Sequence, residues 1–303
     1  MWERIKEILE IKARHLEGLL RKATVRGVGI GYKVVGGEVT DELSLVVLVT
    51  RKLKPLEDIP PSHRIPREIE GVRTDVIDVG VVRVSPPEPT ALRRDWLRPA
   101  PGGCSIGHVR VTAGTMGCLV RRGKERFILS NNHVLAATNL GAKGDYILQP
   151  GPADGGRVPE DGIAELAEYV PLDFSGVNQV DAAIARPFSQ ELVVDEILDI
   201  GVPLGAGDPE LQQEVLKSGR TTGLTRGHVG VVEATIDVLY GERKVRFEGQ
   251  CVIPVPGFSR GGDSGSAIIS TDRKIVGLLF AGSEEATVFT PIRRVLQALK
   301  VEL

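Results

Sequence analysis

Residues 1–22 place apolar side chains at helical spacing, with charged side chains between them. Trp2, Ile5, Ile8 and Leu9 begin an apolar stripe that continues along one face of the pattern. This spacing predicts an amphipathic helix that docks on a sheet or on a second subunit. Because charges interrupt the segment throughout, it lacks the apolar stretch of a secretory signal peptide, and we expect a cytoplasmic protein.

The chain then changes to the short apolar runs that are typical of β-strands. Val25–Val35 and Leu43–Arg51 are rich in β-branched residues and are joined through Gly36 and Gly37, and Val72–Val84 is a third such run. Together with the helix, these runs predict a small α+β domain over residues 1–85. We expect this N-terminal domain to act in regulation or in assembly.

Prolines and glycines are concentrated in residues 86–103. Such a composition sustains neither a helix nor a strand ladder, so this stretch is predicted to be a linker between two domains.

From residue 104 onward, short apolar runs are separated by glycine and proline at intervals of roughly 8 to 12 residues, as in β-barrels and sandwiches. Only residues 291–300 return to helical spacing, with Pro291 placed for a first helical turn. The pattern predicts a mainly β domain over residues 104–303, closed by a C-terminal helix.

Composition excludes several classes of function. The 38 basic and 40 acidic residues nearly balance, with an isoelectric point near 6.3, so we expect no nucleic-acid partner. The apolar runs are too short to cross a bilayer, and we expect no membrane span. The odd number of cysteines, three, without a close pair, indicates neither a disulfide framework nor a zinc site.

Two further patterns resemble ligand motifs but depart from them. The glycines of residues 26–31 lack the spacing and the following helix of a dinucleotide-binding loop. Asp154, Glu160 and Asp161 lack the regular spacing of a calcium loop, and we expect them to lie in a solvated loop. The sequence therefore predicts no cofactor and no metal.

One serine lies between glycines in the loop of residues 259–267, directly before an apolar run. A serine hydroxyl attacks a carbonyl when a base takes its proton and nearby donors receive the developing oxyanion. Glycines allow backbone amides to approach that oxyanion, which makes the amides of Gly262 and Ser264 the expected donors. By itself, this loop is also consistent with a glycine-rich turn that exposes a serine.

A base and its carboxylate partner have candidates elsewhere in the chain. Of the five histidines, His133 stands at the end of an apolar run, where the polarity changes abruptly. Asp181 begins the apolar run of residues 180–185, where an unpaired buried acid would be costly. An acid of this kind holds an imidazole in the tautomer that a general base needs. A lone histidine in such a place is more often structural.

The order His133, Asp181, Ser264, with separations of 48 and 83 residues, resembles that of the chymotrypsin-fold serine proteases. The residues around His133 and the run of residues 286–292 are similar to glutamyl endopeptidases and high-temperature-requirement proteases. The strings SNNHVLA, LQPG, NQVDAAIA and KSGRTTGLTRGHVG are similar to bacterial relatives of the plant narrow-leaf protein family.

This resemblance implies a double six-stranded β-barrel, with the catalytic triad His133, Asp181 and Ser264 at the cleft between the barrels. The first barrel is expected over residues 104–195 and the second over residues 196–292. The resemblance also implies a specificity pocket, whose expected residues are Phe258, Phe280, Ala281 and Gly282. Such a pocket favours small or apolar substrate side chains, whereas Glu284 or Glu285 reaching into it would select a basic one.

The leading hypothesis is a serine endopeptidase that acts on peptide or protein substrates. Three alternatives remain open: a protease-fold scaffold without activity, control of the cleft by the N-terminal domain, and acyl transfer on a small compound. That control takes the form of inhibition or of assembly into a homo-oligomer, a trimer or a hexamer. The sequence also departs from digestive proteases because no freed apolar N-terminus is available to pair with Asp263.

Overall fold

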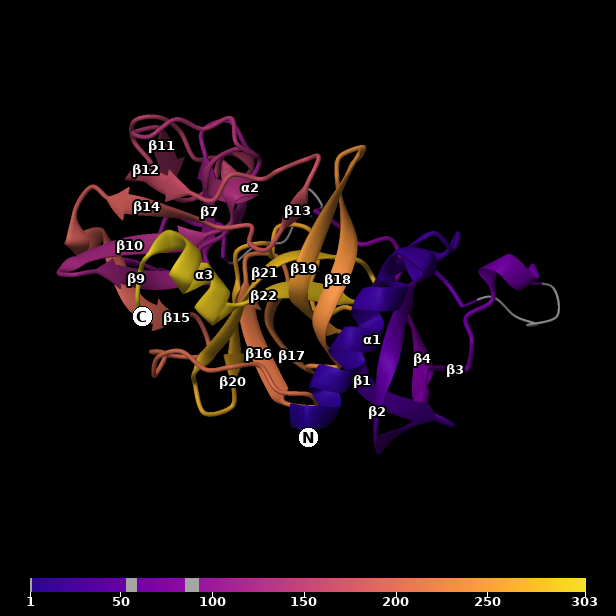
Figure 1. The fold of residues 1–303 in the computed structure, drawn as a ribbon. Helices are drawn as coiled ribbons and strands as arrows, with labels where there is room; N and C mark the ends of the chain where they lie inside the picture. The colour runs from indigo at the N-terminus through magenta and orange to yellow at the C-terminus, as the bar shows by residue number, and fades with distance from the viewer. Residues whose placement is uncertain (1, 53–58, 85–92) are drawn as a thin grey trace.

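Two curled β-sheets dominate the fold in the computed structural model, which describes residues 2–52, 59–84 and 93–303 (Figure 1). The first sheet has seven strands in the order β8-β7-β11-β12-β14-β10-β9. Its strands are β7 (Ser105–His108), β8 (Gly114–Thr115), β9 (Cys118–Arg122), β10 (Glu125–Ser130), β11 (Tyr146–Leu148), β12 (Gly162–Tyr169) and β14 (Ala183–Pro187). All its neighbouring strands are antiparallel.

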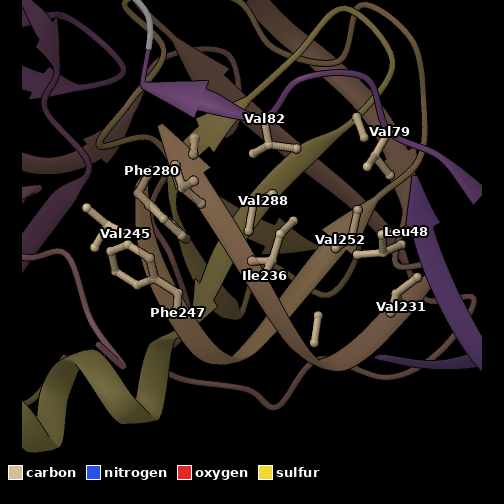
Figure 2. Packing of buried hydrophobic residues seen from close by; sticks show 14 of the residues in the cluster. Leu48, Val79, Val82, Val231, Ile236, Val245, Phe247, Val252, Phe280 and Val288 are labelled. Atoms are coloured by element: carbon tan, nitrogen blue, oxygen red, sulfur yellow. The ribbon is translucent and has the colours of Figure 1, made fainter. Parts of the chain in front are cut away.

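The second sheet has thirteen strands, and seven of them come from residues 214–291. These seven are β16 (Glu214–Gly219), β17 (Gly223–His228), β18 (Val231–Tyr240), β19 (Arg243–Ile253), β20 (Ala267–Ser270), β21 (Ile275–Gly282) and β22 (Thr287–Pro291). A two-residue turn that starts at Gly241, with φ of 61°, joins β18 to β19, as the tight hairpin geometry requires. Ile236, Phe247, Phe280 and Val288 pack inside this sheet (Figure 2).

The remaining elements of the described residues are helices, 3-10 turns and the strands outside residues 214–291 and the first sheet. The helices are α1 (Trp2–Leu20), α2 (Asn132–Leu135) and α3 (Ile292–Leu299), and 3-10 turns span Pro61–His63, Pro152–Asp154 and Gln190–Leu192. The other strands are β1 (Val25–Val35), β2 (Glu38–Val49), β3 (Glu68–Ile69), β4 (Val72–Asp78), β5 (Arg83–Val84), β6 (Ala100–Gly102), β13 (Val177–Asn178) and β15 (Val193–Ile197). The expected N-terminal and C-terminal helices are both present. Among the described residues, no helix combines the length and apolarity that crossing a bilayer demands.

The N-terminal segment forms the predicted helix and strands but shares a sheet with the second barrel. β1 pairs antiparallel with β18, so the order of the second sheet continues β19-β18-β1-β2-β4-β3 (Figure 1). The glycine repeat permits this approach, because a Cβ on Gly27 would lie 2.8 Å from Thr235 O and one on Gly31 would lie 2.6 Å from Gly230 O. The glycines that resemble a nucleotide loop thus serve close strand packing.

Two sequence predictions are corrected in this region. Val72–Val84 is not one strand: it leaves the sheet after Asp78, because Val79 and Val82 turn into the core, and it pairs again only at β5. The predicted linker spans residues 86–103, and its first part, residues 86–92, lies outside the described residues. Its described part contains β6, which pairs parallel with β15 in a separate two-stranded sheet, and Ala100 of β6 packs in the core of the first barrel.

Candidate active site

His133 and Asp181 form a short hydrogen bond at the edge of the first barrel. The chain turns from β10 into the single-turn helix α2, which carries His133, while Asp181 lies just before β14. His133 Nδ1 lies 2.6 Å from Asp181 Oδ2, and the His133 amide donates to Asp181 Oδ1 at 3.3 Å. The Asp181 side chain is fully buried. The carboxylate therefore accepts hydrogen bonds from both the ring and the backbone amide of the histidine.

Two more side chains hold the aspartate. Asn131 Nδ2 donates to the Asp181 carbonyl oxygen at 2.8 Å, which ties the end of β10 to the start of β14. Tyr240, at the end of β18, donates from its hydroxyl to Asp181 Oδ2 at 2.6 Å. Burial, and then the neighbouring Asp181, raise the pKa of Tyr240 well above its usual value, so this hydroxyl keeps its proton. The sequence did not indicate a role for Tyr240, because a tyrosine at the end of a strand is common.

Ser264 reaches the same place from the second barrel. It lines a cavity of about 220 Å³ together with His133, Gly262 and Val84. Its hydroxyl lies 3.3 Å from the Phe280 carbonyl oxygen, and the buried His133 Nε2 has no hydrogen-bond partner among the described residues. The structure thus brings His133 and Ser264 to one cavity, with Asp181 buried next to the histidine and the serine hydroxyl turned to Phe280.

The loop before Ser264 is fixed by its neighbour Asp263. The Asp263 carboxylate is buried and accepts hydrogen bonds from the amides of Thr221, Thr222 and Arg260 at 2.8 to 3.1 Å. The Thr222 hydroxyl donates to the same carboxylate at 2.6 Å. Gly262 adopts φ of 95°, a conformation that suits glycine. Asp263 therefore fixes the backbone that bears the predicted oxyanion donors, Gly262 and Ser264.

A larger cavity of about 1020 Å³ opens beside Ser264. Ala281 and Gly282 line it as predicted, and so do Glu284 and Glu285. Phe258 and Phe280 do not: both side chains are buried in the hydrophobic core. This corrects the prediction for these two residues: Phe280 packs in the core of the second sheet, and Phe258, in the loop between β19 and β20, packs in another buried hydrophobic cluster.

The N-terminal segment also contributes to this cavity. Asp78, Gly80, Val81 and Arg83 line the wall that faces Gly282. The Ser283 hydroxyl donates to the Val79 carbonyl oxygen at 2.6 Å, which fastens the two walls to each other. The sequence did not predict this contribution, because it placed residues 1–85 in a separate domain.

Asp154 occupies a different environment from the solvated loop that we expected. Its carboxylate is fully buried and accepts a hydrogen bond from Arg220 Nε at 2.7 Å. Arg220 follows β16, so this ion pair links the first barrel to the second. Asp154 is accordingly a structural residue at the junction of the barrels.

No family model matches the chain. The rice (Oryza sativa subsp. japonica) protein NARROW LEAF 1 is 23% identical over 334 aligned positions, which cover 91% of this chain and 54% of the rice protein. The chain therefore spans about half the length of this curated relative.

Solved structures of serine proteases superpose on about two thirds of the chain. A glutamic-acid-specific serine protease matches with a TM-score of 0.51 and 22% identity, over 67% of this chain and 100% of that chain. Thermobifida fusca Protease A matches with a TM-score of 0.50 and 19% identity, over 67% and 97%. The Nocardiopsis protease gives a TM-score of 0.50 and 18% identity over the same shares. With its two curled sheets, the chain has the chymotrypsin-like fold and resembles the bacterial trypsin-like serine proteases.

Proposed function

We propose that the chain is a serine endopeptidase that cleaves peptide bonds through an acyl-enzyme intermediate. The observation that carries the proposal is the 2.6 Å contact of His133 Nδ1 with a fully buried Asp181, in a cavity that Ser264 also lines. With its Nδ1 proton donated to the carboxylate, the imidazole presents an unprotonated Nε2 to that cavity. A ring nitrogen with no partner among the described residues, on a histidine that lines the same cavity as the serine, can act as the general base.

The reaction then follows from these groups. The Ser264 hydroxyl leaves the Phe280 carbonyl oxygen, gives its proton to His133 Nε2 and attacks the substrate carbonyl carbon. The amides of Gly262 and Ser264 stabilise the oxyanion that forms. His133 returns the proton to the leaving amine, and the C–N bond breaks to give an acyl-Ser264 ester. Water, deprotonated by His133, then hydrolyses this ester and restores the serine.

The cavity beside Ser264 supports a peptide rather than a small acyl compound as substrate. Its volume of about 1020 Å³ lies at the upper end of ligand sites. Its lining mixes small residues such as Ala281 and Gly282 with the acidic Glu284 and Glu285. The acidic residues favour a substrate with a basic side chain, whereas the small residues leave the inner part of the cavity to an apolar side chain.

Covalent labelling tests this proposal. Full-length protein is treated with a fluorophosphonate probe and its intact mass is measured, alongside Ser264→Ala and His133→Ala. We expect one adduct per chain in the wild type, none in Ser264→Ala and a strongly slowed reaction in His133→Ala. A wild type that forms no adduct while remaining folded would overturn the proposal in favour of a protease fold used for binding.

A further inference from the structure

Tyr240 connects the second sheet to the carboxylate of the first. Asp181 Oδ2 accepts hydrogen bonds from two donors, the Tyr240 hydroxyl at 2.6 Å and His133 Nδ1 at 2.6 Å. The orientation of this one oxygen therefore depends on a side chain from each barrel.

The ring of Tyr240 has little freedom to move. It is buried and stacks on Phe247 with ring centroids 6.0 Å apart and an interplanar angle of 19°. It also meets the rings of Phe174 and His133 edge to face, at 6.3 Å and 6.0 Å. A ring enclosed in this way points its hydroxyl in one direction, which is toward Asp181.

We infer that Tyr240 is a positioning residue for the His133–Asp181 pair, an inference that rests on the proposed protease function. The phenol fixes the rotation of the buried carboxylate, so that Oδ2 faces the imidazole and keeps Nε2 directed at the cavity. Substrate does not need to touch Tyr240 for this effect.

The test compares Tyr240→Phe, which removes only the hydroxyl, with Phe247→Leu, which disturbs the packing of the same ring. In Tyr240→Phe we expect kcat to fall by about tenfold or more, as for loss of a hydrogen bond to a charged group, with KM nearly unchanged. Phe247→Leu is expected to lower Tm while keeping most of kcat. The low-field proton resonance of the His133 Nδ1–H group is expected to shift in Tyr240→Phe and to vanish in His133→Ala.

This resonance reads the His133–Asp181 bond even in a protein that turns over no substrate. An unmoved resonance, with kcat within twofold of the wild type, would mean that Tyr240 only fills space. A shifted resonance in a chain that fluorophosphonate never labels would uphold the positioning role and reject the protease proposal.

A second and independent observation concerns β5, the strand of Arg83 and Val84. Arg83 pairs antiparallel with Gly282 of β21 on one side and parallel with Leu239 of β18 on the other. Phe280, two residues before Gly282, has its carbonyl oxygen 3.3 Å from the Ser264 hydroxyl. β5 therefore pairs with the part of β21 that lies next to Ser264.

Extended peptides commonly bind by adding a strand to a free sheet edge. A peptide that reached Ser264 along β21 would need the hydrogen-bonding groups of Gly282, which β5 now uses. Val84 in addition lines the small cavity that contains His133 and Ser264. The chain's own β5 therefore stands where an extended substrate would lie.

The side chains of the segment before β5 are buried more deeply than those of β5. Val79 and Val82 are buried in the core, and the Leu239 amide donates to the Val82 carbonyl oxygen at 3.2 Å. Arg83 is exposed and Val84 is only half-buried. Displacing β5 from β21 would break the pairing of Arg83 with Gly282 without exposing the buried Val79 and Val82.

We propose that β5 acts as an internal competitor for the peptide-binding edge of β21, so that an extended substrate must displace Arg83 and Val84. This regulation rests on the proposed protease function. It would lower the apparent affinity for extended peptides without touching the reacting groups.

Arg83→Pro tests the competition, because proline lacks the amide hydrogen that a strand pair uses. Arg83→Ala, which keeps the backbone donor, is the matched control. Both variants remove the Arg83 side chain from the cavity wall, and only proline also removes the amide hydrogen of the strand pair. For an extended peptide substrate we therefore expect KM in Arg83→Pro to lie about tenfold below KM in Arg83→Ala, as when a competing segment that occupies the site most of the time is removed.

A binding measurement completes the test without catalysis. In the Ser264→Ala background, a fluorescein-labelled peptide with the sequence of residues 81–88 is titrated and its anisotropy recorded, with and without Arg83→Pro. Tighter binding with Arg83→Pro supports the competition. Equal peptide affinity with and without Arg83→Pro, or equal KM in Arg83→Pro and Arg83→Ala, would show that substrate does not displace β5. Absence of labelling in every variant would instead reject the protease proposal.

Discussion

Lys217 Nζ lies 3.7 Å from Asp263 Oδ2, and both side chains are completely buried. Lys217 belongs to β16, whereas Asp263 precedes Ser264 in the loop that carries the proposed oxyanion donors. Lys217 Nζ also donates to the Gly223 carbonyl oxygen at 2.9 Å. A lysine from within a strand thus supplies the positive charge next to the aspartate that precedes Ser264.

Replacing Lys217 by methionine is expected to destabilise the protein by about 3 kcal/mol at pH 7, because Asp263 would lose its buried counter-charge. Urea unfolding measures this difference. Lys124→Met, at an exposed hairpin position, is the control and should change the free energy of unfolding by less than about 0.5 kcal/mol. Equal stability of both variants would mean that the pair contributes nothing.

The same pair predicts a pH dependence. Burial lowers the pKa of Lys217 to about 8 from its usual 10.5. Between these values the unfolded chain holds a proton that the folded chain has released, so raising the pH favours the folded state. The stability of the wild type relative to Lys217→Met should therefore increase from pH 8 to pH 10.5. A constant difference across this window would contradict burial of a titrating lysine.

Asp181→Asn tests the carboxylate while preserving its shape. An amide at this position no longer attracts the imidazolium and offers its donor group to a histidine nitrogen that is itself a donor. We expect kcat toward a peptide substrate to fall by about 10⁴-fold, as for a histidine held in the wrong tautomer. Circular dichroism should show a folded protein. A loss of less than about tenfold would mean that His133 does not depend on Asp181.

The glycine after the serine is expected to be irreplaceable. Gly265 has φ of 95°, and a Cβ there would overlap Ser130 Oγ and the Thr115 carbonyl oxygen. Gly265→Ala should cost more than about 3 kcal/mol, through backbone strain and overpacking together. Gly123 has φ of 61° and open space where a Cβ would lie. Gly123→Ala therefore measures the backbone strain alone, which should cost about 1 kcal/mol. Similar Tm values for the two variants would refute the steric argument.

The sequence was sufficient to identify the residues that stand out from their immediate neighbours in the chain. His133, Asp181 and Ser264 each stand at a change of polarity beside an apolar run, and their order added the resemblance that joined them. The sequence did not indicate a role for Tyr240 or Lys217. Each contacts an aspartate that is distant in the chain, and the spacing of apolar residues does not reveal such contacts. The resemblance placed Phe258 and Phe280 in a pocket, whereas both side chains are buried in hydrophobic clusters of the second barrel, which only the folded structure reveals.

The largest departure of the fold from the prediction is also a matter of long-range pairing. A proline-rich stretch after residue 85 resembles a domain boundary, yet β1 pairs with β18 more than two hundred residues away, with Gly27 opposite Ile236. The repeat of glycines in β1 was visible in the sequence. Its meaning, close approach to another strand, required knowing which strand that was.

This shared sheet predicts that the N-terminal segment and the second barrel unfold together. A Cβ on Gly29 would overlap Val231 and lie 3.1 Å from the Val232 carbonyl oxygen, so Gly29→Val should push β1 away from β18. Gly18→Ala, in open space on α1, should instead stabilise the helix by up to about 1 kcal/mol.

Differential scanning calorimetry distinguishes the two arrangements. One peak, with calorimetric and van't Hoff enthalpies that agree, is expected for the wild type, and Gly29→Val should lower the Tm of that whole peak. Gly18→Ala should raise it slightly. Two peaks, of which Gly29→Val moves only one, would mean that the N-terminal segment folds as a separate unit. In that case the hydrogen bonds between β1 and β18 would add little to the stability of the barrel.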